Sequence, residues 1–474
     1  MDGPDTDIAF RLAKFWSTMQ ARGNIVLVNA TPYAWRLKAT EVHQHEDMLW
    51  KFGESANIVE PYAIKIVEVE CRNPDAHAKS TYELQGTDDL FTIASQGHVL
   101  QASMDGIETR NASRGSEVPL GFISDRPSYF VLSGKHGDYY SVGDVSNWMQ
   151  KSLDTIGYYK LRDICVPSSH DAGMSKAPWS TTFAAAGSII TQILSVEQQL
   201  HKGVRYLDIR PIFFRGKWVC GHYSFIPENK WINIGPMGTW QGGNGENIQD
   251  IIDGINRFTA SSGELIVLQI SHTYMVNDVF GQFAHDDFKE LDYNHWDNLL
   301  SMFTNTSTGI KSLWRPSPNE PSVTDLTALP LKTYIGDGKS AVVLVVDDKI
   351  GVRSYPGVFN DRQWQWDYSA WWKEESGRLD EYKEYLRSSS TKPYSFSGCH
   401  MQSDGEAVLT TLGQSSQSVL SLATPSKHRL FVDLFPLCAK EGKFPAALTM
   451  DAIDSSDLAA LCIAFNNCRR AQSS

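Results

Sequence analysis

Hydrophobic and polar positions are arranged differently in the two parts of the chain. Up to about residue 150, short runs rich in β-branched and aromatic residues alternate with polar turns such as Arg72–Asp75. Runs of this kind, with few helical patterns between them, predict a β-sandwich. The predicted strands are Asn24–Asn29, Tyr62–Val69, Leu90–Ile93, His98–Ala102 and Tyr129–Leu132, preceded by a short amphipathic helix, Ile8–Met19.

From Leu161 onward, apolar runs of strand length alternate with segments of helical period. No glycine-rich dinucleotide-binding pattern follows the first strand, so repeated βα units favour a closed parallel α/β barrel over an open sheet. We therefore predict two domains, residues 1–150 and residues 151–474. The predicted barrel strands are Ile164–Pro167, Val204–Ile209, Lys217–Cys220, Leu265–Ile270, Ala341–Val346, Tyr394–Cys399 and Ala446–Met450, and the predicted helices are Ile189–Lys202, Asn247–Ala260, Asp286–Phe303, Gly377–Leu386 and Ser455–Arg469.

Composition and charge narrow the functional classes. The chain has 474 residues, of which 42% are hydrophobic and 21% charged, the balance of an ordinary globular protein. Its 55 acidic and 43 basic residues give a formal net charge of −12, which disfavours a nucleic-acid-binding surface and simple docking on anionic lipid. The seven cysteines are widely spread and form no CxxC pattern, so they predict neither a disulfide framework nor a zinc site.

Neither a signal peptide nor a membrane span is predicted. The first 23 residues contain three aspartates and no continuous apolar stretch. The longest apolar run, Ala341–Val346, is too short to cross a bilayer. We expect a cytoplasmic protein that can make peripheral contact with membranes.

Imidazole and charged side chains lie near the ends of the predicted barrel strands. His170 follows the first of these strands and His222 follows Lys217–Cys220, so both are expected to end neighbouring strands at the rim where such barrels place active sites. Asp208 and Arg210 share one face of the strand between them, because strand side chains alternate with a period of two, and in a barrel that face can be the interior.

Two histidines and an arginine suit phosphoryl transfer. One histidine can take a proton from an attacking hydroxyl and the other can give one to the leaving oxygen. The planar guanidinium can bind the nonbridging oxygens. Taken singly, a His–Asp pair or an Asp-x-Arg strand is more often a structural feature, but their order and placement together favour a site.

These stretches resemble the X domain of phosphatidylinositol-specific phospholipase C. The resemblance is carried by Ser169–Gly173, Gln199–Arg210, Gly221–His222 and, for the fourth strand, Glu264–His272. It covers about residues 157–451 and is nearest to the bacterial, metal-independent members. It implies a distorted TIM-like barrel and an enzyme of lipid metabolism, a phosphodiesterase or phosphorus–oxygen lyase that releases diacylglycerol and a cyclic inositol phosphate.

The resemblance also implies how protons move. His170 would be the general base that deprotonates the inositol 2-hydroxyl, and Asp451 would orient it. His222 would be the general acid that protonates the diacylglycerol oxygen, with Asp208 supporting it.

The phosphate is assigned to Arg210, with Asp171 positioning the arginine. Calcium-dependent relatives use hard oxygen ligands beside the phosphate, whereas Arg210 is a fixed cation that cannot ligate calcium. We therefore expect a site without a metal or cofactor, although Asp171 and Asp208 remain available as carboxylates.

The predicted substrate contacts lie in later loops. Ser271 and His272 stand where bacterial members tend to have a lysine, which predicts a preference for an unphosphorylated head group or for a neutral substrate not built on inositol. Trp364 and Trp366 belong to a tryptophan-rich stretch that could cap the pocket or enter a lipid interface. The alternative is that this stretch packs a long loop onto the barrel.

We therefore predict an enzyme that cleaves a phospholipid or another phosphodiester by intramolecular attack. One alternative is an enzyme of the same fold acting on a glycerophosphodiester or a non-lipid metabolite. Another is a lipid-binding protein with a dormant barrel. The set of His170, Asp208, Arg210 and His222 favours an enzyme. The first domain is expected to bind lipid or a partner.

Overall fold

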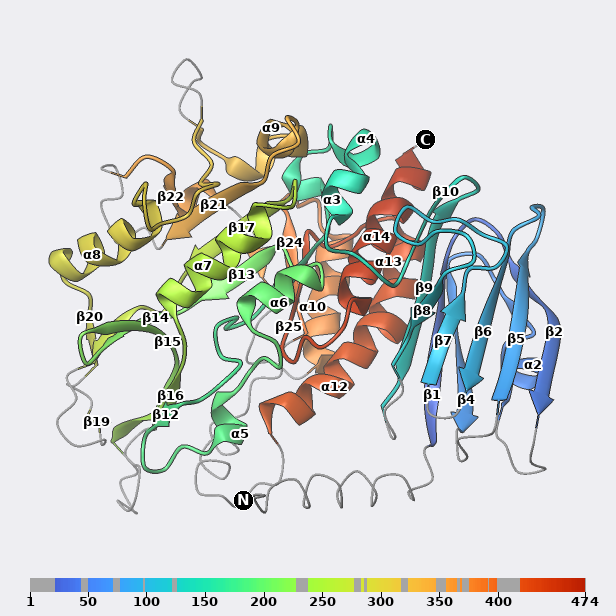
Figure 1. Ribbon diagram of the computed structural model, residues 1–474, viewed down its shortest axis with the longest axis horizontal. Helices are drawn as coiled ribbons and strands as arrows, with labels where there is room; N and C mark the ends of the chain where they lie inside the picture. The colour runs from blue at the N-terminus through green and yellow to red at the C-terminus, as the bar shows by residue number, and fades with distance from the viewer. Residues whose placement is uncertain are drawn as a thin grey trace, which may run out of the picture. The chain divides into compact units, whose positions relative to one another are not determined.

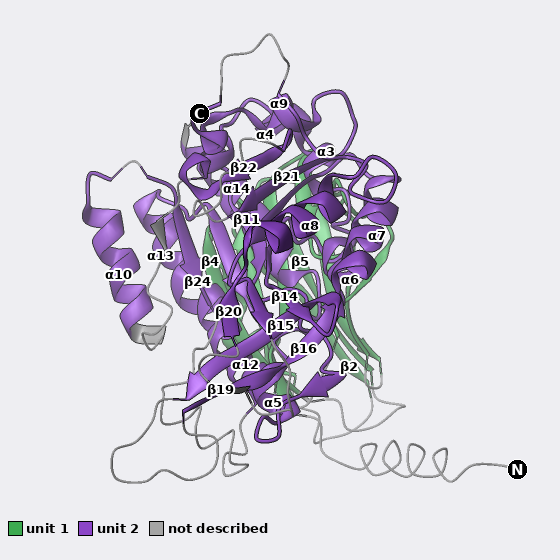
Figure 2. Cartoon of the chain, turned by 90° about the vertical axis from the view of Figure 1, so that its left-hand side faces the viewer, with its two compact units in different colours: residues 1–143 green, residues 144–474 purple. Residues whose placement is uncertain are grey.

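The computed structural model describes two compact units, residues 1–143 and residues 144–474, shown in green and purple in Figure 2. The predicted helix Ile8–Met19 lies outside the described residues. The role expected for the first unit stays a prediction. The described residues are 22–43, 50–70, 77–96, 99–121, 126–226, 238–276, 283–284, 288–316, 323–346, 355–364, 367–368, 375–390, 392–398 and 418–473.

The first unit contains two sheets. In one, β1 (Arg22–Ala30) pairs antiparallel with β4 (Ala63–Glu70) and parallel with β9 (Ser128–Lys135), in the order β10-β9-β1-β4. The other is antiparallel and has the order β3-β2-β5-β6-β7-β8. The remaining elements are β2 (Trp35–His43), α2 (Phe52–Ser55), β3 (Ile58–Val59), β5 (His77–Leu84), β6 (Leu90–Gln96), β7 (Val99–Ser103), β8 (Glu117–Pro119) and β10 (Asp138–Ser141).

Aromatic rings from both sheets meet in the core of this unit. The ring of Phe91 on β6 lies 4.9 Å from that of Trp35 on β2 and 4.9 Å from that of Phe130 on β9, measured between centroids. All three side chains are fully buried. Ring pairs of this kind add ~0.5–1.5 kcal/mol beyond the area they bury. The two sheets therefore share one core, while the sandwich topology stays a prediction.

The second unit is built on an eight-stranded parallel sheet with the order β22-β21-β17-β13-β11-β25-β24-β23 (Figure 1). Of these strands, β11 comes first along the chain and β25 comes last, and the two pair with each other, as in a closed βα barrel. Among the described residues no pairing joins β22 to β23, so closure stays a prediction. The strands are β11 (Val166–Ser169), β13 (Tyr206–Ile209), β17 (Leu265–Ile270), β21 (Ala341–Val346), β22 (Val358–Asn360), β23 (Asp367–Tyr368), β24 (Tyr394–Ser397) and β25 (Ala447–Met450).

Helices complete this unit. Every residue of β21 is buried, as expected for parallel strands covered on both faces. The prediction of a helix over Ile189–Lys202 is wrong in its first half, because a capping box of Ser195 and Gln198 starts α6 at Val196. No helix of the described residues is long and apolar enough to cross a bilayer. The helices are α3 (Trp148–Lys151), α4 (Leu153–Ile156), α5 (Ala186–Ile189), α6 (Val196–His201), α7 (Ile248–Thr259), α8 (Tyr293–Thr304), α9 (Leu331–Ile335), α10 (Glu375–Arg387), α12 (Val419–Arg429), α13 (Phe435–Glu441) and α14 (Asp457–Ser473).

A seven-stranded, mostly antiparallel sheet also belongs to this unit and was not predicted. The predicted barrel strand Lys217–Cys220 is in fact the start of β15 (Lys217–Ile226) in this sheet. Arg215 and Gly216 both have positive φ and form the two-residue turn that folds β15 back on β14. The other strands are β12 (Trp179–Ser180), β14 (Pro211–Phe214), β16 (Thr239–Asn247), β18 (Tyr274–Val276), β19 (Phe283–Ala284) and β20 (Phe288–Glu290).

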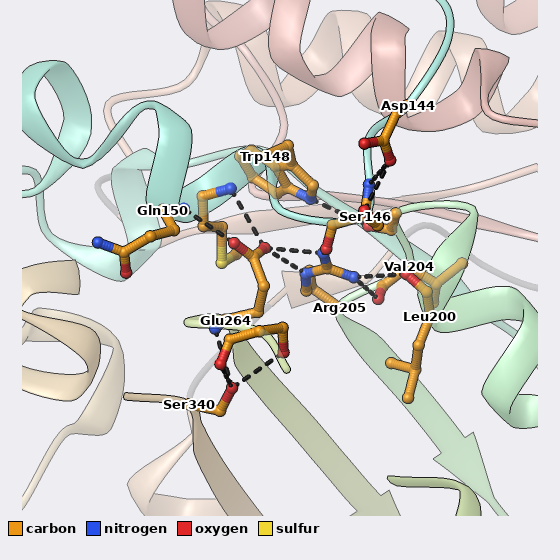
Figure 3. Close-up of polar contacts among 12 residues, drawn as sticks. Asp144, Ser146, Trp148, Gln150, Leu200, Val204, Arg205, Glu264 and Ser340 are labelled. Atoms are coloured by element: carbon orange, nitrogen blue, oxygen red, sulfur yellow. Dashed lines mark hydrogen bonds and ion pairs between the residues drawn. The ribbon is translucent and has the colours of Figure 1, made fainter. Parts of the chain in front are cut away.

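A buried ion pair joins the amino ends of β13 and β17 (Figure 3). Arg205, directly before β13, donates from Nε to Oε2 of Glu264, directly before β17, over 2.7 Å. Their side chains are 1% and 0% exposed. Glu264 also accepts the backbone N–H groups of Met149 and Gln150. The guanidinium donates further to the carbonyl oxygens of Ser146, Leu200 and Val204.

Candidate active site

The carboxyl edge of the parallel sheet brings together a histidine and an aspartate. β11 ends at Ser169 and β25 at Met450, and these two residues are paired. His170 directly follows β11 and Asp451 directly follows β25. Nδ1 of His170 lies 2.8 Å from Oδ1 of Asp451. Their side chains are 6% and 1% exposed. A carboxylate at Nδ1 holds the proton there, so Nε2 is the nitrogen that accepts a proton.

Three loops at this edge share one backbone conformation. Asp171, His272 and Ala452 each lie two positions beyond the end of β11, β17 or β25, and their φ angles are 44°, 47° and 54°. Residues other than glycine rarely adopt this left-handed region, and such residues cluster at functional sites. The residues directly before them, at the edge of the sheet, are His170, Ser271 and Asp451.

Arg210 is held between two aspartates. Its Nε and Nη2 lie 3.0 and 2.9 Å from Oδ2 of Asp208, and its Nη1 lies 3.6 Å from Oδ2 of Asp171. Ser271 donates from Oγ to Oδ1 of Asp208 over 2.6 Å. The guanidinium is therefore fixed in position on one side, while 15% of the side chain stays exposed.

Burial and Arg210 act in opposite directions on the pKa values of the two aspartates. Burial alone would raise the pKa of Asp208, but Arg210 lowers it well below its usual range. At Asp171, burial raises the pKa to about 7 although Arg210 opposes the rise. Burial would lower the pKa of Arg210, but the aspartates raise it above its usual value. At neutral pH, Arg210 and Asp208 are thus charged, and Asp171 is close to its titration midpoint.

His222 lies within β15 of the seven-stranded sheet, so the prediction that it ends a strand neighbouring β11 is wrong. Nδ1 donates to the carbonyl oxygen of Ile189 over 3.0 Å. Burial, and after it the charge of Arg210, lower the pKa of His222 to about 4, so the imidazole is within electrostatic reach of the site. The predicted support by Asp208 is absent from the described contacts, because Asp208 bonds Arg210, Ser271 and the backbone of Asp171 instead.

The predicted substrate contacts have structural neighbours of their own. Ser271 bonds Asp208, and its Oγ also lies 3.0 Å from Nδ1 of the exposed His272. Trp364 is 4% exposed and packs against Tyr206, with ring centroids 5.8 Å apart. Trp366 lies outside the described residues. Substrate contact by these four stays a prediction.

Carboxylates that could hold a metal are found in two places. In the site, Asp171 and Asp208 both face Arg210, so a second cation there would meet its repulsion. Within the described ranges, the group with three side chains close enough to share an ion is Asp88, Asp89 and His136, in the first unit. The prediction of a metal-independent site stays a prediction.

Comparison with known proteins identifies a relative in sequence. The variant-surface-glycoprotein phospholipase C of Trypanosoma cruzi is 25% identical over 202 residues. The chain is similar to phospholipases C. The alignment covers 36% of this chain and 47% of the relative, so the chain spans about half the length of the curated relative it matches. No model of a protein family matches the chain.

Solved structures of bacterial phospholipases C are also similar. A phosphatidylinositol-specific phospholipase C of Staphylococcus aureus has a TM-score of 0.44 and 14% identity, over 68% of this chain and 97% of that chain. The enzyme of Listeria monocytogenes has a TM-score of 0.44 and 13% identity, over 68% of this chain and 98% of that chain. The match in sequence to the trypanosome phospholipase C confirms the predicted resemblance to phospholipases C.

Two residues around this candidate site were missed in the sequence. Thr191 and Gln192 are fully buried polar residues between α5 and α6, bonded to the loops of His170 and Asp451. The signal was present: they are adjacent polar residues between Ile190 and Ile193 in an otherwise apolar stretch. The predicted helix Ile189–Lys202 would have put both residues on a helix rather than in the segment between α5 and α6.

Proposed function

We propose that the chain is a phospholipase C-like phosphodiesterase that cleaves its substrate by attack of one of the substrate's own hydroxyl groups. The observation that carries the proposal is the 2.8 Å contact of His170 with Asp451 beside the paired Arg210. A proton acceptor and an anchored cation at one edge of a sheet are the groups that attack on a phosphodiester requires.

His170 takes the proton of the attacking hydroxyl. Asp451 holds Nδ1–H, so Nε2 accepts the proton, and the buried carboxylate stabilises the imidazolium that forms. The hydroxyl oxygen bonds to phosphorus and the bond from phosphorus to the leaving alkoxide breaks. The products are a cyclic phosphodiester and an alcohol, which for a phosphatidylinositol substrate is diacylglycerol.

Arg210 binds the nonbridging oxygens of the phosphate. Asp208 engages Nε and Nη2, while Nη1 is 3.6 Å from Asp171, beyond hydrogen-bond distance. N–H groups of the guanidinium therefore remain to donate to phosphate oxygens. Because Asp208 holds the arginine in advance, little reorganisation is required when charge develops on those oxygens.

His222 protonates the leaving oxygen. In the absence of substrate it is neutral at pH 7, because burial lowers its pKa to about 4 and Arg210 contributes to the lowering. A bound phosphodiester anion offsets the charge of Arg210 and so favours the imidazolium. On this view, the general acid becomes protonated when the substrate is bound.

The preferred substrate is a phospholipid with an unphosphorylated head group. In the described part of the loop after β17, the side chain of Ser271 is bonded to Asp208 and the side chain of His272 is exposed. A histidine attracts a phosphorylated ring less than a permanent ammonium does. An enzyme of the same fold acting on a glycerophosphodiester is the second candidate, favoured by this lack of a lysine.

The test compares substrates and one matched pair of variants. The full chain is incubated with phosphatidylinositol, a glycerophosphodiester and a soluble phosphodiester, and ³¹P NMR detects a cyclic phosphate product. His170→Ala should lower kcat/KM by ~10²–10⁴-fold. His201→Ala, which removes an exposed histidine of α6, should leave it unchanged. Near-full activity of His170→Ala on the best substrate would refute the proposal.

A further inference from the structure

The segment between α5 and α6 lies against both loops that carry the proton-transfer pair. Two adjacent polar residues of this segment, Thr191 and Gln192, are 0% exposed. Neither side chain carries a charge or can act as an acid or base near neutral pH. Their function must therefore lie in what they bind.

Gln192 bonds to both loops through its side-chain amide. Nε2 donates to the carbonyl oxygen of His170 over 2.7 Å and to that of Met450 over 3.1 Å. Oε1 accepts the backbone N–H of Ile453 over 3.1 Å. Both amide hydrogens are thus used, one on His170 after β11 and the other on Met450 at the end of β25, while Oε1 binds the loop after β25.

Thr191 repeats this pattern. Its Oγ1 donates to the carbonyl oxygen of Asp171 over 3.0 Å, and its carbonyl oxygen accepts the N–H of Ala452 over 2.8 Å. Asp171 and Ala452 are the residues with left-handed φ in these loops. A left-handed φ in a residue other than glycine persists only where the surrounding structure holds it. Thr191 bonds the backbone of both residues.

The contact between His170 and Asp451 requires such a brace. The two residues are 281 positions apart in the chain, and each lies one position beyond the last paired residue of its strand. The last backbone bond between the two strands runs from the N–H of His170 to the carbonyl oxygen of Met450 over 3.2 Å, so Asp451 lies beyond it. A displacement of about 1 Å at a reacting group can cost ~10²-fold in rate.

We propose that Gln192, assisted by Thr191, is a positioning residue that sets the distance and orientation between His170 and Asp451. Its effect on turnover rests on the proposed function, but its effect on the contact itself does not. The brace fixes the backbone of both loops at once, so that Asp451 meets Nδ1 rather than water.

A second buried glutamine provides the matched control. Gln199 on α6 is also 0% exposed, and its Nε2 donates to the carbonyl oxygens of Ala172 and Leu194 over 2.9 and 2.7 Å. It makes as many donor bonds from Nε2 as Gln192, but neither goes to the loop after β25. Replacing it removes the same number of donor bonds from Nε2 without releasing Asp451 from His170.

The experiment compares Gln192→Met with Gln199→Met in the full chain. The downfield proton resonance of Nδ1–H in His170 reports its bond to a carboxylate without any substrate. We expect both variants to lose thermal stability to a similar extent. Only Gln192→Met should shift or lose this resonance and lower kcat by ~10–10²-fold with little change in KM. Thr191→Val, which removes one hydroxyl, should give a smaller change in the same direction and decides the question if Gln192→Met does not fold.

The outcomes separate the two proposals. A folded Gln192→Met with an unchanged resonance and the kcat of Gln199→Met would overturn the positioning role, and so would an unaltered resonance in Thr191→Val if Gln192→Met fails to fold. A lost resonance in a chain whose parent cleaves no phosphodiester would support the positioning role and refute the proposed function.

Discussion

Replacing Glu264 by glutamine should destabilise the second unit strongly, because it leaves a buried charge without its counter-charge. The substitution keeps the shape of the side chain. Arg205 stays in place with 1% of its side chain exposed. The new amide keeps one oxygen and presents N–H groups in place of the other, so one of the backbone N–H groups of Met149 and Gln150 loses its acceptor.

The expected loss in the free energy of unfolding is about 3 kcal/mol. Removing one partner of a buried ion pair costs ~3–5 kcal/mol. Arg205 keeps its bonds to the carbonyl oxygens of Ser146, Leu200 and Val204, and its guanidinium lies 5.1 Å from the ring centre of Phe258. These contacts partly solvate the charge, which places the loss at the low end of the range.

Urea unfolding, with hydrogen exchange as the readout, measures the loss in the free energy of unfolding for residues 144–474 separately from the first unit. The matched control is Glu197→Gln, which breaks an ion pair with Arg257 in which the side chains are 30% and 61% exposed. An exposed pair contributes ~0–1 kcal/mol, so this variant should be nearly neutral. Replacing both buried partners, as Arg205→Met with Glu264→Leu, should recover part of the stability.

A result would refute the reasoning if Glu264→Gln cost no more than Glu197→Gln. The charge of Arg205 would then be solvated by the carbonyl oxygens alone. Turnover provides a second check. The pair lies at the amino ends of β13 and β17 and the site lies at the carboxyl edge of the same sheet, so kcat at low temperature should be unchanged while the unit is folded.

Three further predictions concern the site. Arg210→Met should raise the pKa of His222 from about 4 toward its usual range, because a cation that disfavours the imidazolium is removed; an NMR titration that finds no rise would show that Arg210 does not act on His222. Activity should survive excess EDTA, and complete loss restored by calcium would contradict Arg210 as the cation at the phosphate. Phosphatidylinositol should be cleaved faster than its bisphosphate at equal surface concentration, since extra phosphates lack cationic partners near Ser271 and His272; the reverse order would reveal a basic pocket.

Parts of the fold can be predicted from the sequence because their residue patterns fit only one kind of element. β17 and β21 have the predicted bounds, since runs of six residues that are apolar throughout in β21 and apolar except for Gln269 in β17 fit strands covered on both faces. The seven-stranded sheet was not readable, because its strand β16 reads TWQGGNGEN and shows no alternation. A Cβ on Gly242 would lie 2.0 Å from the backbone oxygen of His222, so close approach of two strands, a tertiary demand, decides that residue.

The site was readable to a similar degree. The sequence indicates His170, Asp208 and Arg210, because polar side chains at strand ends cost free energy unless they meet a partner or a substrate. The structure brings Arg210 and Asp208 together. Asp451 was reached only through a resemblance, since nothing local connects it to His170. The sequence predicts the wrong neighbouring strand for His222, because the hairpin turn at Arg215 and Gly216 folds its strand back on β14.

The pairing of β25 with β11 also sets when the chain can become active. Since His170 and Asp451 are 281 positions apart, they meet only after the last strand of the sheet has joined the first. Contacts of such long range form late and slowly during folding, and a chain made on the ribosome folds from its amino end. In refolding, the amide protection of β13 and β17 should therefore return before His170 acquires its carboxylate. A partly made sheet holds His170 and Arg210 but lacks Asp451, so under the proposed mechanism an incomplete chain cannot orient its base.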